Sequence, residues 1–187
     1  MMDQWTLPRA VSVGGRMHAI HADFRDILQI IAELTNENVP EPLRWEIAGC
    51  LFCDDFDAMS STDKTELLRQ LAQFVNCGSP EDPDAPKRPK MIDWQQDQQL
   101  IVADVNRVAG QEIRALPFVH WWTFMAWFNA VGDGTLANVV ALREKLRKGK
   151  KLESWEREFY NENRKMIDFQ TQYTDAEDDL LRLWTGR

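Results

Sequence analysis

The sequence has few cysteines and histidines, and it has no apolar stretch long enough to cross a membrane. It contains 3 cysteines and 3 histidines among 187 residues. An odd number of cysteines, with an N-terminus that lacks the basic and apolar regions of a signal peptide, is typical of free thiols in a reducing cytosol. The longest apolar stretch, from Pro117 to Val131, would reach about 22 Å as a helix, which is short of the ~30 Å hydrocarbon core of a bilayer. We therefore expect a cytoplasmic protein that spans no membrane.

Basic residues are outnumbered by acidic ones, 22 to 30, and the formal net charge is −8. Because an acidic protein is repelled by a phosphate backbone, we do not expect nucleic acid as the main partner. One basic run, from Arg143 to Lys151, departs from this balance. It lacks the aromatic side chains on which bases stack, and it ends a predicted helix, where cations complement the helix dipole. This run is therefore interpreted as an exposed helix end.

Phosphate-binding loops and nucleophile elbows are also missing from the sequence. Cys50 and Cys53 form a C-x-x-C, but the pair lies inside a predicted helix, whereas a redox motif follows a strand and opens a helix. A structural zinc site needs about four ligands. The other soft ligands stand at no recognised zinc spacing: Cys77, His18, His21 and His120. The sequence therefore predicts two buried apolar thiols, and it predicts neither an enzyme, a metal site nor a cofactor.

The histidines and the acidic residues after Cys53 are predicted to have structural roles and not catalytic or metal-binding ones. His18 and His21 are expected to be strand or surface residues, because no nucleophile or paired carboxylate is marked beside them. His120 is expected to be a hydrogen-bonded histidine of the core. The acidic residues of 54–57 lack the Gly and the terminal Glu of a calcium loop, so they predict a solvated turn.

Hydrophobic periodicity predicts a mostly α-helical fold of about seven helices that follow a short N-terminal β-hairpin. Gly14-Gly15 can supply the positive φ angles of a two-residue turn between strands at 9–13 and 16–21. Apolar residues at helical spacing then predict helices at 24–34, 40–53, 60–77, 93–109, 117–131, 136–148 and 152–169. In the second of these helices, the apolar residues Leu43, Ile47 and Leu51, together with Trp45, are expected to face inward.

Four prolines stand among charged residues between Ser79 and Lys90, which predicts a linker or exposed loop at 79–90. This segment separates an N-terminal region of a hairpin and three helices, residues 1–78, from a C-terminal helical region, residues 91–169. Residues 170–187 form a tail that is first acidic and then apolar. We expect these parts to form one composite domain.

The aromatic helix expected at 117–131 organises the predicted C-terminal region. Pro117 suits the first turn of a helix, and Gly132-Asp133-Gly134 ends it. Since none of its faces is polar, this helix is either the packing centre of that region or partly a contact surface for a partner. The candidate partner or self-association residues are large apolar side chains of this helix and of the tail: Trp121, Trp122, Phe124, Trp127, Phe128, Leu180, Leu183 and Trp184.

Several short segments follow one another in a recognisable order. They are Ala22-Asp23-Phe24-Arg25 after the hairpin, Asp93-Trp94-Gln95-Gln96-Asp97 after the Pro-rich break, Phe118-Val119-His120-Trp121-Trp122-Thr123-Phe124, Lys148-Gly149-Lys150-Lys151-Leu152 and Glu158-Phe159-Tyr160. In this order, which spans nearly the whole chain, the sequence resembles the tail assembly chaperone family of long-tailed bacteriophages and prophages. The sharpest marker is the His-Trp-Trp triplet that precedes Phe124.

The resemblance implies a mostly helical protein of the bacterial host cytoplasm that acts during phage assembly and is absent from the mature virion. Such chaperones bind the tape measure protein, keep it soluble and promote assembly of the tail tube. The resemblance therefore implies the tape measure and tail tube proteins as partners, and a homo-oligomer. Two alternatives stay open: a structural or connector component of the phage particle, and a small metal-dependent enzyme that uses Cys50, Cys53 and the histidines.

Overall fold

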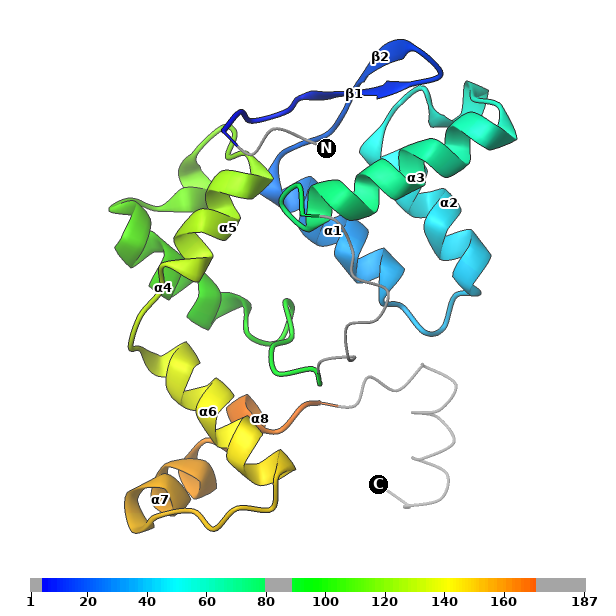
Figure 1. Cartoon of the computed structure of the whole chain (residues 1–187). Helices are drawn as coiled ribbons and strands as arrows, with labels where there is room; N and C mark the ends of the chain where they lie inside the picture. Colours follow the sequence, from blue (N-terminus) through cyan, green and yellow to red (C-terminus); the bar gives the residue numbers. More distant parts are fainter. Residues whose placement is uncertain (1–4, 80–88, 171–187) are drawn as a thin grey trace. The chain divides into compact units, whose positions relative to one another are not determined.

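The computed structural model describes residues 5–79 and 89–170, and these residues are mostly helical (Figure 1). They form eight α-helices, two short 3-10 helices and one two-stranded antiparallel sheet. The bounds are β1 Ala10–Val13, β2 Arg16–Ala19, α1 Phe24–Leu34, α2 Glu41–Phe52, η1 Phe56–Ala58, α3 Ser61–Val75, α4 Gln98–Ala109, η2 Ile113–Ala115, α5 Trp121–Asn129, α6 Thr135–Arg147, α7 Ser154–Glu162 and α8 Arg164–Ile167. The predicted fold class, mostly α with a short N-terminal hairpin, is confirmed. Among the described helices, none has the length and apolar character of a membrane span.

The chain divides into two compact units that do not follow the predicted ranges. The first unit combines Met1–Pro89 with Leu100–Gly132, and the second combines Lys90–Gln99 with Asp133–Arg187. Residues 100–132 therefore pack with the N-terminal elements, although the sequence places them in the C-terminal region. Most of the predicted linker, residues 80–88, and nearly all of the predicted tail, residues 171–187, lie outside the described residues.

The hairpin of β1 and β2 belongs to the first unit and forms where the sequence predicts it. Gly14-Gly15 takes φ values of 56° and 76°, the left-handed conformation that a two-residue primed turn requires. The two valines of β1 are buried, whereas Met17 of β2 is 68% exposed. β1 packs on α3 (Figure 1), where the side-chain amide of Gln70 donates to Ser12 O at 2.6 Å. Because an isolated hairpin is only marginally stable, this packing is what holds it.

The buried face of α2 differs from the predicted one. Its buried residues are Ala48, Gly49 and Phe52, while Leu43, which the sequence places inward, is 51% exposed. A Cβ atom at Gly49 would lie 2.5 Å from ring carbons of Phe56. The helix therefore approaches η1 through its smallest side chains. The spacing of the large apolar residues indicated the wrong face because close approach here depends on a residue without a side chain.

The start of α5 also differs from the prediction, since the helix begins at Trp121 and not at Pro117. The segment before it is extended and pairs with the start of α1. Trp121 N–H donates to Ala22 O at 2.8 Å, and Phe24 N–H donates to Val119 O at 2.9 Å. Because these backbone groups are engaged by a distant part of the chain, they are not available for helical hydrogen bonds. The aromatic helix is therefore shorter than predicted.

The second unit contains α6, α7 and α8. α6 forms within a residue of its predicted bounds, but the helix predicted at 152–169 is interrupted at Asn163 (φ −119°, ψ 27°) and divides into α7 and α8. The helix predicted from Asp93 begins only at Gln98. The Asp93 carboxylate accepts hydrogen bonds from two following backbone N–H groups at 2.9 and 2.8 Å. Residues 94–97 form a turn between this cap and the helix.

Candidate functional site

The aromatic residues at the start of α5 belong to the core of the first unit. Trp121, Trp122 and Phe124 are almost fully buried. Trp121 Nε1 donates to Val75 O and Trp122 Nε1 donates to Phe74 O, both at 2.9 Å. Both carbonyl groups lie at the end of α3, in the N-terminal half of the chain. The prediction that this helix is the packing centre of the C-terminal region is therefore wrong, because its indole groups bind α3.

Two residues of the predicted contact surface stay half-buried on α5, Trp127 and Phe128. The Phe128 ring stacks on the Phe124 ring with centroids 6.4 Å apart. The aromatic core thus continues outward to side chains that reach solvent. The tail residues of the predicted surface lie outside the described residues: Leu180, Leu183 and Trp184. Of the described members of that surface, Trp127 and Phe128 are the ones accessible to a partner.

Asp23 joins the start of α1 to the segment before α5. Its Oδ1 accepts from Arg25 N–H at 3.0 Å, and its Oδ2 accepts from Val119 N–H at 2.8 Å. Arg25 Nη1 also donates to Asp23 Oδ1 at 3.1 Å, while Arg25 Nη2 donates to Leu116 O at 2.5 Å. The carboxylate is buried, so these donors offset the cost of removing it from water. Asp23 is therefore both a helix cap and the link between two distant segments.

His120 is the hydrogen-bonded core histidine that the sequence predicts. Its Nδ1 accepts from Trp122 N–H at 3.1 Å, which caps α5. Its Nε2 lies 2.9 Å from Pro8 O, which is an acceptor. The ring is therefore neutral with its proton on Nε2, because Nδ1 must accept while Nε2 donates. Burial lowers the pKa of His120 below its ordinary value, although the bond to Pro8 opposes that shift.

The structure brings His18 and His21 against the acidic turn after α2, which the sequence does not signal. His21 N–H donates to Phe52 O at 2.9 Å, so the chain after β2 is tied to the end of α2. His18 Nδ1 lies 2.9 Å from Asp55 Oδ2, and His21 Nε2 lies 2.9 Å from Asp54 Oδ1. The turn is exposed, as predicted, but its carboxylates have histidine partners. No spacing rule could have found these pairs, since the partners belong to separate elements and are 37 and 33 positions apart in the sequence.

The two cysteines of the C-x-x-C lie in different environments, so the prediction of two buried thiols is wrong for Cys50. Cys50 is exposed, and its thiol donates to Asp57 Oδ1 at 3.4 Å. Cys53 is buried, and burial raises the pKa of its thiol, while the Asp55 backbone N–H offsets part of that rise. Cys53 Sγ, the His18 ring nitrogen and an Asp55 carboxylate oxygen all lie within 4.8 Å of one another. These three donor atoms converge from β2 and the end of α2.

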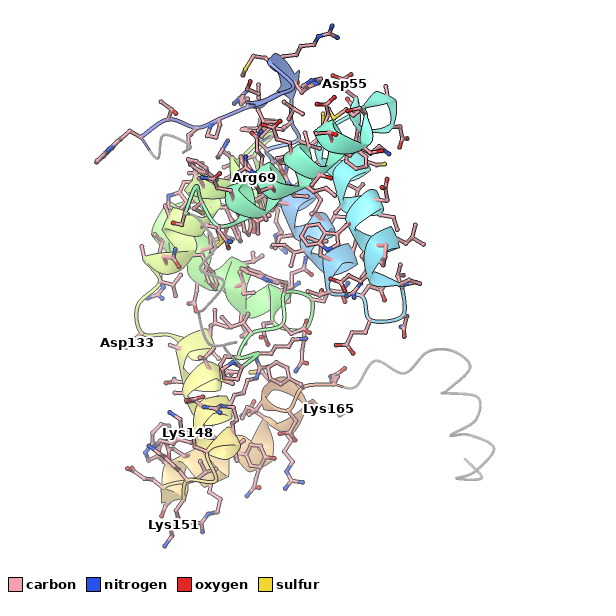
Figure 2. The ribbon with its side chains drawn as sticks, turned by 45° about the vertical axis from the view of Figure 1, so that its right-hand side comes forward. Asp55, Arg69, Asp133, Lys148, Lys151 and Lys165 are labelled. Atoms are coloured by element: carbon pink, nitrogen blue, oxygen red, sulfur yellow. The ribbon has the colours of Figure 1, made fainter. Side chains whose placement is uncertain are left out.

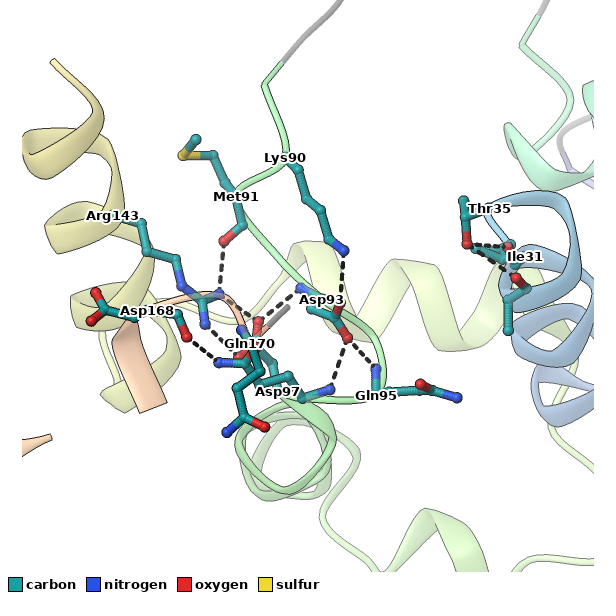
Figure 3. A network of polar contacts seen from close by, with 12 residues as sticks. Ile31, Thr35, Lys90, Met91, Asp93, Gln95, Asp97, Arg143, Asp168 and Gln170 are labelled. Atoms are coloured by element: carbon teal, nitrogen blue, oxygen red, sulfur yellow. Dashed lines mark hydrogen bonds and ion pairs between the residues drawn. The ribbon is translucent and has the colours of Figure 1, made fainter. Parts of the chain in front are cut away.

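In the second unit, Arg143, the first residue of the basic run that was predicted to be an exposed helix end, is buried. Arg143 forms a bidentate ion pair with Asp97, with Nη1–Oδ2 and Nη2–Oδ1 distances of 2.6 and 2.9 Å (Figure 3). Its remaining donors reach Ile167 O, Met91 O and Met166 O at 2.7, 3.0 and 2.8 Å. All the N–H groups of the guanidinium are therefore used. Arg143 is not part of an exposed helix end, because the buried Asp97 carboxylate supplies its counter-charge.

The rest of the basic run contains several ion pairs. Lys145 Nζ lies 2.5 Å from Glu156 Oε1, while Arg147 Nε and Lys148 Nζ lie 2.9 and 2.5 Å from Glu144 oxygens. Lys148 and Lys151, which belong to this run, are labelled in Figure 2. Hydrogen bonds from Arg147 and Lys148 lower the pKa of Glu144 to about 2. Much of the positive charge that the sequence concentrates here is thus balanced by carboxylates of the same unit.

Comparison with known proteins does not assign this chain to a family. The chain matches no family model, and it shows no significant similarity to a curated protein or to a solved structure. Any functional conclusion therefore depends on the residues and contacts of the two units.

Proposed function

We propose that this chain is a non-enzymatic tail assembly chaperone of a long-tailed bacteriophage or prophage. It binds the tape measure protein, keeps it soluble and promotes assembly of the tail tube, while self-associating in the host cytoplasm. The observation that carries the proposal is the ordered set of segments that resembles this family, with the His120-Trp121-Trp122 triplet before Phe124 as its sharpest marker.

Two of the segments that carry the resemblance contact each other in the folded chain. Asp23, in the first segment, accepts a hydrogen bond from Val119, in the aromatic segment, although the two residues are 96 positions apart. Ala22 O accepts from Trp121 N–H, so the backbone of the same two segments is also paired. Each segment needs the other to satisfy its buried polar groups. The two segments therefore form one structural feature of the first unit.

A second pair of contacts has the same character in the other unit. Asp97 ends the segment that follows the Pro-rich break, and its carboxylate holds Arg143 of α6. Gln96 of that segment donates to Met166 O and Asp168 O at 3.3 and 2.8 Å, on either side of the end of α8. The segment thus joins the parts of its unit.

The half-buried aromatic side chains of α5 are suited to hold a helical client. Phe128 stacks on Phe124 of the aromatic core, and Trp127 beside it in the sequence is half-buried. Phe118, just before the helix, is 37% exposed. Rigid aromatic side chains are enriched among the residues that dominate binding energy at interfaces. An amphipathic helix, such as those of a tape measure protein, would place its apolar face against such side chains.

Co-expression with the tape measure protein of the same phage tests the proposal. We expect the wild-type chain to increase the soluble fraction of that client, and the double variant Trp127→Ala/Phe128→Ala to lose this effect while keeping its helical circular dichroism spectrum. Trp155→Ala is the matched control, because Trp155 is 55% exposed on α7 of the other unit. If the client is no more soluble with the wild-type chain than without it, the proposal is wrong. Mass spectrometry of purified virions would instead reveal a connector, which stays in the particle.

A further inference from the structure

The side of the first unit where the hairpin meets the end of α2 carries an unusual collection of metal-binding groups. His18 lies on β2, and Cys53 follows the last residue of α2. Asp55, which is labelled in Figure 2, belongs to the turn that leads into η1. The bond from His21 N–H to Phe52 O fixes these elements against each other at the backbone. Side chains on two separate elements thus converge through a rigid framework, which is what a preformed ligand set requires.

The three donor atoms have the chemistry and nearly the spacing of a zinc site. Tetrahedral zinc holds cysteine sulfur at about 2.3 Å and histidine nitrogen or carboxylate oxygen at about 2.0–2.2 Å, so neighbouring ligand atoms are about 3.3–3.6 Å apart. Here the atoms of His18, Cys53 and Asp55 lie within 4.8 Å of one another. The longest separation closes by no more than about 1.5 Å. The Asp55 side chain is 66% exposed, so it can shift as the ligand set contracts.

We propose that His18 Nδ1, Cys53 Sγ and an Asp55 carboxylate oxygen bind a zinc-class divalent transition metal, with water as the fourth ligand. A buried thiolate and an imidazole select such ions over magnesium and calcium, which prefer oxygen ligands only. Binding releases the thiol proton to solvent and shifts the His18 ring proton from Nδ1 to Nε2, so that Nδ1 can bind the metal. The hydrogen bond between His18 and Asp55 is replaced by two metal–ligand bonds. The site is independent of the proposed chaperone function.

The surroundings of the site favour a cation. Asp54 pairs with His21 next to Asp55, and Asp57 accepts from the Cys50 thiol on the exposed side of the same turn. These carboxylates add negative charge around the bound ion without occupying its ligand atoms. The metal would link the marginal hairpin to α2, so its effect is to stabilise the first unit.

A titration of the full-length chain with Co²⁺ after treatment with a chelator tests this site. We expect binding of one equivalent with a cobalt–thiolate charge-transfer band, which Zn²⁺ then removes by competition. Cys53→Ser should abolish the band. Cys50→Ser is the matched control and should keep it, since Cys50 lies one turn away on the same helix and outside the ligand set. A band that survives Cys53→Ser, or one that disappears in Cys50→Ser, overturns the assignment.

Two more variants guard against loss of folding at the buried cysteine. His18→Gln and Asp55→Asn change side chains nearer the surface, and circular dichroism checks that each variant is folded. We expect each to weaken Co²⁺ binding at least about tenfold, since even the loss of an outer partner of a ligand has that effect. Excess Zn²⁺ should also raise the thermal unfolding temperature of the wild-type chain but not of Cys53→Ser. No saturable binding by the folded wild-type chain would refute the site.

Discussion

Replacing Arg143 with methionine should strongly destabilise the second unit. The side chains of Arg143 and Asp97 are 3% and 1% exposed, so neither charge can be solvated by water. Without the guanidinium, the Asp97 carboxylate keeps one backbone donor, Asp93 N–H at 2.9 Å. Breaking a buried ion pair from one side typically costs about 3–5 kcal/mol, because an uncompensated charge stays buried. We expect the free energy of unfolding of this unit to fall by about that amount.

Urea denaturation followed by circular dichroism measures the loss, and hydrogen exchange of α6 and α8 assigns it to this unit. The double variant Asp97→Leu/Arg143→Met removes both charges and should recover most of the stability. Recovery is incomplete because the backbone carbonyls bound by the guanidinium lose their donor in both variants. Arg147→Met is the control on the same helix, and it should leave the urea midpoint almost unchanged, since its ion pair is exposed.

The reasoning is refuted if Arg143→Met costs less than about 1 kcal/mol, which is the range of an exposed ion pair. It is also refuted if the double variant is as unstable as the single one. In that case the loss would come from the missing carbonyl donors and not from a stranded charge.

Three smaller predictions concern the first unit. Trp122→Ala should lower the free energy of unfolding by about 3–5 kcal/mol, because the ring is buried and its indole binds Phe74 O; an unchanged urea midpoint would contradict this. Gly49→Ala should cost about 1–3 kcal/mol, because the added Cβ meets the Phe56 ring at 2.5 Å, and thermal unfolding measures it. Burial keeps the pKa of His120 below 6.5 in the folded chain, so stability should fall as the pH drops below about 6.5, where the unfolded chain takes up the proton more readily. Comparing His120→Gln with wild type on either side of this pH should show a weaker pH dependence in the variant, and equal slopes would refute the neutral core histidine.

Features that depend on sequence neighbours could be predicted. The Gly14-Gly15 turn follows from the φ angles that only glycine adopts easily, and the cap of α3 follows from Ser60, whose side chain accepts from Asp63 N–H. In both cases the groups that make the structure lie within three positions of each other. The helical spacing of apolar residues similarly located nearly every helix, because burial of one face requires that period.

Features that depend on distant partners could not be predicted. Pro117 has the right residue type for a first helical turn, but the backbone after it pairs with the start of α1. In the sequence, Arg143 cannot be distinguished from the other cations of the basic run, because its partner Asp97 is 46 positions away. Leu43 has the right spacing for a buried face, but a glycine decides which side of α2 approaches η1. Each error arises where a long-range contact outweighs a local preference.

The same limitation changes how a missing motif should be interpreted. Cys50 and Cys53 form a C-x-x-C, but the other soft ligands stand at no recognised zinc spacing in the sequence, and on that basis a metal site was not expected. His18 lies 37 positions from Asp55, yet the two side chains are in contact. Zinc motifs with short spacings arise when ligands share one turn or one knuckle, whereas ligands on different elements have whatever spacing the fold requires. The bond from His21 to Phe52 supplies that fold-level constraint here. Irregular spacing is therefore no argument against a site whose ligands come from a strand and from the end of a helix.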